Sequence, residues 1–331
     1  MAVGYLLCRR PSCLPLYRSY SGPAFYILTE FFNPQQLHMV AVVEGLRWCR
    51  EFGHFSSYAT TIVTSTLALR TALAGPLYTF TEKNQALIAS AHYESSLVAS
   101  SPRYAVRQKN GMVDTRLQNS LYRRTYAQKC QELGCHPLKS VIFGMFQLPF
   151  WMTATFGLRN ACGLQLTPLL YWPPMIPEFV AEGLTSPTTS LGLIALTAIV
   201  TTLNVEIGHL RRVYGFATAR SMPADSQGAA PKSISVVVPP RLPWQLKFAH
   251  GVCGLGAFLL TTVSFVAPSA LVIFWCTSAS HQLILHLLHL SPRVRAFLGI
   301  VSTPIDAKHP YQALWAVAKR HYRLLRWLSS T

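Results

Sequence analysis

Acidic side chains are scarce in this sequence. Its 331 residues include 12 Asp and Glu against 29 Lys and Arg, which leaves a net charge of +17, and charged residues of both signs make up only 12% of the chain. Hydrophobic residues make up 50%. Soluble globular domains carry about twice that share of charged residues, so the composition excludes an ordinary soluble protein and predicts a membrane protein.

Motifs that carry chemistry are also lacking. The sequence has no phosphate-binding glycine loop, no HExxH and no GxSxG, and its apolar stretches hold too few acidic residues for a proton relay. Cys130 and Cys135 have no second pair at zinc-site spacing. His281, His286 and His289 have no carboxylate or thiolate at the spacing that a haem or metal site needs. We therefore expect no enzymatic activity, no cofactor and no metal.

Five apolar stretches are long enough to cross a bilayer, which takes a helix of about 20 residues. They cover residues 57–78, 139–158, 191–207, 248–266 and 271–290. Lys and Arg gather in every second connection, whereas the connections at 159–190 and 267–270 hold one and none. By the positive-inside rule, this alternation predicts a five-helix bundle with its long basic loops and C-terminus on the cytoplasm-like side.

The first 29 residues have the composition of a mitochondrial transit peptide. They include Arg9, Arg10 and Arg18 but no Asp or Glu, and the apolar run at 3–7 is too short for a secretory signal. Mitochondrial import would place the basic loops in the matrix. We therefore expect a multi-pass protein of the mitochondrial inner membrane with its C-terminus in the matrix.

The segments outside the spans differ in character. Residues 30–56 are predicted to form an interfacial amphipathic segment, because apolar residues recur at helical spacing over 36–52. Residues 79–137 predict a basic helical hairpin that breaks near 100–102 and is either a solvated surface domain or a cap that touches substrate. The proline-rich composition of 221–243 predicts a disordered insertion, and 291–331 a short basic matrix tail.

Arg70 stands near the middle of the first apolar stretch, which otherwise carries no charge. Translocon scales place the cost of an arginine at the centre of a spanning helix at about 2.5 to 3.5 kcal/mol. It lies too many turns from either interface to reach water by extending its side chain. We therefore predict that Arg70 is functional and faces a protein-lined or watery cavity.

Polar residues also interrupt the second and third apolar stretches. Gln147 and Pro149 mark a face of the second stretch that turns towards the bundle interior, or a kink with a satisfied polar contact. Asn204, Glu206 and His209 end the third stretch and either widen a hydrophilic cavity or lie at the interface, which the sequence slightly favours.

Short segments of the chain resemble the YidC/Oxa/Alb membrane-protein insertases, and most closely the mitochondrial branch that assists cytochrome c oxidase assembly by exporting the C-terminal tail of subunit II. The matching segments follow in the family's order over residues 36–315. They are residues 65–70, 135–139, 147–151 with Pro149 and Trp151, 156–160, 204–207, 267–270 with Pro268, and 274–275 with Trp275.

The resemblance implies a five-helix insertase core around a hydrophilic groove that is open to the matrix and closed towards the intermembrane space. Arg70, Gln147 and Asn204 would line the groove, where Arg70 attracts acidic residues of the translocating segment. The implied partners are cytochrome c oxidase subunit II, its assembly factors and membrane lipid. The short tail favours this branch over the ribosome-coupled general insertase, so no ribosome or nucleic-acid contact is expected. An anion transporter and a structural respiratory-complex subunit remain alternatives.

Overall fold

A computed structural model describes residues 33, 35–100, 115–163, 174–221, 244–302 and 309–322. Every regular element within these ranges is a helix. Together with the membrane-spanning helices below, this confirms the predicted all-α membrane fold. The predicted transit peptide and, apart from Ser221, the predicted disordered insertion lie outside the described residues.

The elements follow one another in a simple order. They are α2 (Leu37–Gly53), α3 (Tyr58–Leu69), the π turn η2 (Arg70–Ala74), α4 (Gly75–Ser100), α5 (Thr115–Glu132), α6 (Pro137–Met145), α7 (Gln147–Ala161), α8 (Glu178–Ala181), α9 (Leu191–Ser221), α10 (Trp244–Ser264), α11 (Ser269–Leu288), α12 (Pro292–Phe297) and α13 (Pro310–His321).

Each of the five predicted spans overlaps a helix in the structure. Within the described ranges, three helices are long and apolar enough to cross a membrane: Leu138–Ala161, Leu191–Arg212 and Ser269–Leu288. The first and fourth predicted spans are less apolar, because α3 and η2 carry Arg70 and several threonines and α10 begins with Lys247 and His250. That these two cross the membrane as well stays a prediction.

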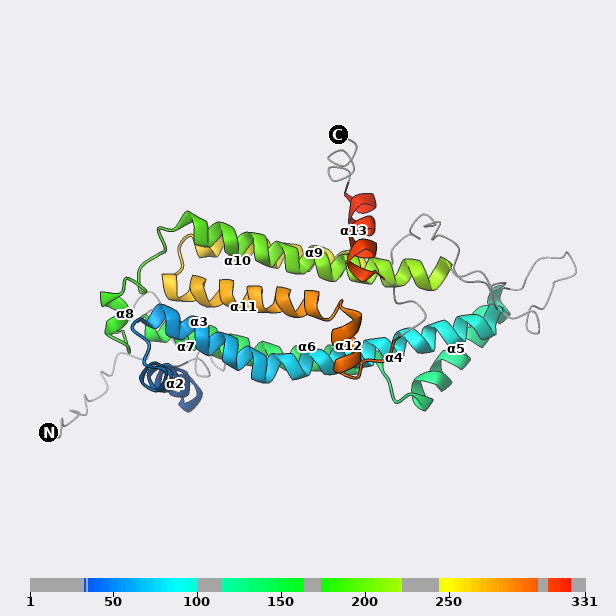
Figure 1. Ribbon diagram of the computed structural model, residues 1–331, viewed down its shortest axis with the longest axis horizontal. Coiled ribbons are helices and arrows are strands. Elements are labelled where there is room, and N and C mark those ends of the chain that lie inside the picture. The colour runs from blue at the N-terminus through cyan, green and yellow to red at the C-terminus, as the bar shows by residue number, and fades with distance from the viewer. Residues whose placement is uncertain are drawn as a thin grey trace, which may run out of the picture.

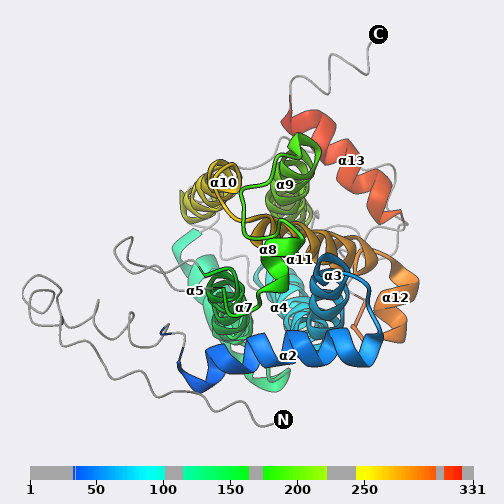
Figure 2. The ribbon, with the colours of Figure 1, turned by 90° about the vertical axis from the view of Figure 1, so that its left-hand side faces the viewer.

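The long helices lie side by side, and α11 is central among them (Figure 1). It packs against α9, α3 and α7, while α10 packs against α9, and α4 packs against α5 and α6. Viewed from the end of the bundle, α2 runs crosswise over it, in contact with α3 and α7 (Figure 2). Helix α2 therefore covers one end of the bundle, and α12 and α13 lie away from that end.

The first long helix widens at Arg70 into one π turn, in which the backbone N–H of Gly75 donates to the carbonyl of Arg70. Pro76 follows directly and has no N–H, and its ring would clash with the carbonyl four residues earlier. The wider turn relieves this conflict, and such π turns are frequent at functional sites. Pro76 therefore accounts for the local geometry around Arg70.

Pro149 accounts for a break in the second span. It cannot donate to the carbonyl of Met145, which lies four residues earlier and is the last residue of α6. The α-helix is interrupted at Phe146, whose backbone angles stay in the helical region, and α7 begins at Gln147. The interruption lies where the sequence predicts a kink and places Gln147 at the junction of the two helices, while the kink itself stays a prediction.

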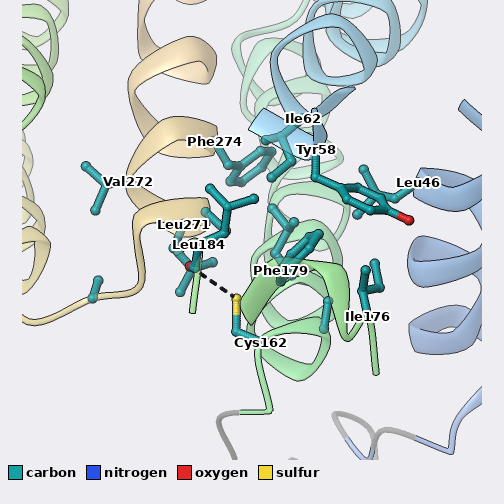
Figure 3. Close-up of a cluster of buried hydrophobic side chains, with 14 of the residues drawn as sticks. Leu46, Tyr58, Ile62, Cys162, Ile176, Phe179, Leu184, Leu271, Val272 and Phe274 are labelled. Carbon is teal, nitrogen blue, oxygen red and sulfur yellow. Dashed lines mark hydrogen bonds between the residues drawn. The ribbon is translucent and has the colours of Figure 1, made fainter. Parts of the chain in front are cut away.

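A large apolar cluster, here called the apolar cap, closes the end of the bundle that α2 covers (Figure 3). It joins α2, α3, α7, the α8 region and the start of α11. Its buried members are Val43, Leu46, Tyr58, Ile62, Leu158, Ala161, Cys162, Ile176, Phe179, Leu184, Ala267, Ala270, Leu271, Val272, Phe274 and Trp275.

Polar contacts fix the rim of the apolar cap. The backbone N–H of Tyr58, at the first turn of α3, donates to both carboxylate oxygens of Glu182, at 3.0 and 2.7 Å. A negative charge at this position also complements the helix dipole. The Arg50 guanidinium lies 3.8 Å from Glu182 and 4.1 Å from the centre of the Tyr58 ring. Glu182 therefore joins α2, α3 and the connection after α7.

Helices α2 and α7 approach each other closely at Gly157. A β-carbon at this position would lie 2.6 Å from a methyl carbon of Val42. The opposite side of α2 is open, where Trp48 and Phe52 stack with ring centroids 5.0 Å apart and are 62% and 73% exposed. The helix thus lies where the sequence predicts an amphipathic segment, with apolar residues on both its protein side and its free side.

Helices α4 and α5 form the helical hairpin expected before the second span. A small core of Ala91, Cys130 and Cys135 holds it together. The side chain of Asn84 then joins the hairpin to α6, because its amide donates to the carbonyl of His136 and accepts from the backbone N–H of the same residue.

Candidate functional site

Arg70 is half-buried and its side chain reaches α11. Its Nη1 donates to Oε1 of Gln282 over 3.4 Å, a long and therefore weak hydrogen bond. None of the ion pairs among the described residues involves Arg70. Arg70, a cation within an apolar helix, is thus weakly hydrogen-bonded to a neutral side chain and remains able to bind a carboxylate.

The residue after Arg70 contacts the residue before Gln282. The hydroxyl of Thr71 lies 3.1 Å from Nε2 of His281, whose side chain is buried at 7% exposure. The other ring nitrogen, Nδ1, is buried and has no hydrogen-bond partner among the described residues. Two consecutive residues of the first long helix therefore face two consecutive polar residues of α11.

Asn204 reaches the same turn of α11 from α9. Its side-chain amide donates to the carbonyl of Ala279 over 2.8 Å, while its Oδ1 is buried without a partner in the described part of the chain. Arg70 and Asn204, both predicted as groove residues, are thus brought to one turn of α11, between Ala279 and Gln282.

Gln147 is not linked to that turn by any hydrogen bond between described residues. It is half-buried at the start of α7, and α7 contacts α11 mainly through the apolar cap. The predicted set of three is therefore joined only in part, and the role of Gln147 in a groove stays a prediction.

A second polar group, here called the Tyr78 cluster, lies about two turns further along the first long helix. Tyr78 Oη lies 2.7 Å from Nδ1 of His286 and accepts from Nη1 of Arg211 over 2.8 Å. Nη2 of Arg211 donates to a carboxylate oxygen of Glu82 over 2.7 Å. Burial alone would raise the pKa of Glu82, but the charge and hydrogen bond of Arg211 outweigh it, and the pKa lies below its ordinary value.

Sequence reasoning missed this cluster. Tyr78 and Glu82 lie four residues apart on one helix face, which is the available signal, but Arg211 counts there only as one of many basic loop residues. His286, which the sequence offers for a haem or metal site, instead contacts a tyrosine hydroxyl. The described residues include no group of three or more His, Cys, Asp or Glu that could hold a metal ion.

The end of the third predicted span packs against α10. His209 is buried at 4% exposure and stacks on His250 with ring centroids 4.0 Å apart. A carboxylate oxygen of Glu206 lies 3.6 Å from Nε2 of His250, and the other accepts from the hydroxyl of Tyr322. Residues of α10 and Tyr322 therefore contact Glu206 and His209, and the interfacial position expected for these two residues stays a prediction.

The four residues predicted as structural motif lie near the cap end or at helix starts. Trp151 packs against the apolar cap and Trp275 is one of its buried members. Pro268 precedes the first turn of α11, and Pro149 accompanies the break between α6 and α7. These positions fit structural roles, as predicted for them.

No family model matches the chain, and no solved structure matches it. The chain is 25% identical over 268 residues to the human protein named "Cytochrome c oxidase assembly protein COX18, mitochondrial". The aligned region covers 77% of this chain and 72% of the human protein. The mouse protein of the same name is 25% identical over 269 residues, with 77% and 72% covered. This confirms the resemblance: the chain is similar to mitochondrial proteins that are named for cytochrome c oxidase assembly.

Proposed function

We propose that this protein works in cytochrome c oxidase assembly, as an insertase of the mitochondrial inner membrane that exports the C-terminal tail of subunit II. The names of its relatives support a role in oxidase assembly and in mitochondria. Three helices able to span a membrane support a membrane location. The proposed work is transfer of a polypeptide across the bilayer without chemical catalysis, nucleotide or cofactor.

The observation that carries this proposal is that the hydrogen-bond partner of Arg70 is a neutral side chain. A structural arginine within a bilayer is expected to pair with a carboxylate, since an unpaired buried cation is costly. Arg70 instead has a neutral partner at 3.4 Å. At an effective dielectric constant of 20, a carboxylate 4 Å away gains about 4 kcal/mol, against about 1 kcal/mol in water. The side chain is therefore suited to hold an acidic group that arrives and leaves.

The difference in polarity between the two ends of the bundle supports a direction of transport for the exported tail. The apolar cap closes the end at α2, and the polar contacts of Arg70 and the Tyr78 cluster follow from the middle of the bundle towards the other end. By the positive-inside rule the latter end faces the matrix. A polar path that reaches partway into the bilayer shortens the apolar distance that a hydrophilic tail must cross.

The test is protease protection of newly made subunit II in mitochondria that lack the endogenous protein and carry this chain or its Arg70→Ala variant. Arg70→Lys is the matched control, because it keeps the charge and loses the planar fork. We expect the C-terminal tail to stay protected in the matrix with Arg70→Ala and to be exported with Arg70→Lys at a reduced rate. The N-terminal tail is scored in the same samples.

The outcomes separate the alternatives. Failure of both tails would indicate a general insertase. Normal export with Arg70→Ala would contradict the role given to Arg70, and normal export without any copy of the protein would contradict the proposed function. A structural subunit would instead regain function when one partner residue is changed to match a reversed charge at position 70, whereas a groove residue responds to the charges of its cargo.

A further inference from the structure

Two buried polar atoms at the turn of α11 that Arg70 contacts have no partner among the described residues, namely His281 Nδ1 and Asn204 Oδ1. Leaving a buried polar group without a hydrogen bond costs about 1–3 kcal/mol, so each such group in a native structure calls for an explanation. His281 belongs to the turn between Ala279 and Gln282, and both Asn204 and Arg70 donate hydrogen bonds to that turn. A common ligand for the three side chains would satisfy both atoms.

The hydrogen bond of Thr71 determines what His281 can offer. The described part of the chain shows no acceptor for the Thr71 hydroxyl other than Nε2 of His281, at 3.1 Å. If the hydroxyl donates there, Nε2 carries no hydrogen, and in the neutral ring the hydrogen is then on Nδ1. In that tautomer, His281 Nδ1 is a buried N–H donor on the same turn as the contact of Arg70.

The three groups have complementary chemistry. Arg70 and the His281 Nδ1–H are donors, which suit the two oxygens of a carboxylate. Asn204 Oδ1 is an acceptor and repels a carboxylate, but it suits an N–H group. A peptide N–H is available only where the backbone is not helical, because within a helix it is bonded to the carbonyl four residues earlier.

We propose that Arg70, His281 and Asn204 form a binding site for an acidic residue in an extended polypeptide segment. The carboxylate binds to Arg70 and to His281 Nδ1–H and displaces Gln282, while a nearby backbone N–H of the same segment donates to Asn204 Oδ1. This deepens the proposed function, on which it rests, because it states that the cargo passes this site unfolded and not as a helix.

The test is peptide binding to the purified full chain in nanodiscs of zwitterionic lipid, measured by fluorescence anisotropy. The peptides differ in one feature at a time: one has a central Asp, one has Asn in its place, and in the others the Asp peptide is N-methylated at one of the backbone nitrogens next to the Asp. We expect the Asn peptide to bind at least about tenfold more weakly, and N-methylation at one position to weaken binding about tenfold.

Two variants at one position isolate the role of His281. His281→Asn places an amide nitrogen near the position of Nδ1, whereas His281→Gln places one near Nε2 and keeps only the contact with Thr71. We expect His281→Asn to bind the Asp peptide within about threefold of the unmodified protein, and His281→Gln to bind it about tenfold more weakly. Asn204→Leu should remove the difference between the Asp peptide and its N-methylated form. Thermal unfolding in the same nanodiscs controls for folding.

Several results would overturn the proposal: no binding of the Asp peptide, equal binding of the Asp and Asn peptides, equal affinities of the two His281 variants, or no effect of N-methylation at any position. Loss of peptide binding in nanodiscs that contain phosphatidylglycerol would also overturn it, by indicating a phosphate site. The assay measures binding without export. Failure of subunit II export in mitochondria would therefore contradict the proposed function and leave the binding result standing.

Discussion

Removing the charge of Glu82 should destabilise the protein more than removing any exposed carboxylate. The Glu82 side chain is 8% exposed and that of Arg211 18%, and they lie 2.7 Å apart. Breaking a buried ion pair on one side costs about 3–5 kcal/mol, because the remaining charge stays buried without compensation. Arg211 keeps its hydrogen bond to Tyr78, so we expect the lower end, about 3 kcal/mol, for Glu82→Gln.

The measurement is unfolding of the purified protein in detergent, followed by temperature and by denaturant. A loss of about 3 kcal/mol should lower Tm by about 4 °C. Glu44→Gln is the matched control, because Glu44 pairs with Arg47 at the same 2.7 Å while its side chain is 57% exposed. Exposed pairs contribute about 0–1 kcal/mol.

A double-mutant cycle completes the test. Arg211→Met with Glu82→Gln removes both charges, so the double variant should be more stable than the sum of the single losses indicates, by about 1.5 kcal/mol or more. If Glu82→Gln shifts Tm no more than Glu44→Gln, or if the two single losses simply add, the stabilising role given to the Tyr78 cluster is refuted.

Three further outcomes follow. Because the pKa of Glu82 is lowered in the folded protein, the folded protein binds fewer protons than the unfolded chain at acidic pH. This contribution to stability is complete above the ordinary pKa of 4.5 and is lost as the pH falls through the lowered value. A plot of Tm against pH should therefore be flatter below pH 5 for Glu82→Gln than for the unmodified protein. Gly157→Ala should destabilise by about 1–3 kcal/mol, because its β-carbon would lie 2.6 Å from Val42, and Val42→Ala should restore part of the loss in denaturant unfolding. Glu182→Gln should cost about 1–2 kcal/mol by weakening the two hydrogen bonds from Tyr58 N–H, and an unchanged midpoint would contradict that contribution.

Local patterns in the sequence predict most of the helices. Apolar periodicity predicts a helix over 36–52, where α2 lies, and a hairpin broken near residue 100, where α4 ends. Pro149 predicts the break before α7, since its effect reaches only four residues back. The π turn at Arg70 depends on Pro76 in the same local way, but a proline near a helix centre predicts a distortion without its type.

The partners of the site residues could not be predicted in this way. Arg70 is conspicuous because one charge stands in an apolar stretch, but its neighbour Gln282 lies 212 residues away and follows from how α11 packs. The same holds for Arg211, which is indistinguishable in sequence from other basic residues after a span. His209 stacks on His250 of α10, a contact that the residues next to it in the sequence do not indicate. Each of these contacts depends on the packing of separate helices, on which local periodicity carries no information.

The most direct test of the account is photo-crosslinking from position 73 during synthesis of subunit II in mitochondria. Leu73 lies one turn after Arg70 and is 38% exposed, and Trp315 on α13, 54% exposed, serves as the control position. A photoreactive residue at position 73 should crosslink to the C-terminal tail of newly made subunit II, and Arg70→Ala should reduce that adduct while a residue at position 315 gives none. Normal export of the tail without any adduct at position 73 would contradict passage along Arg70.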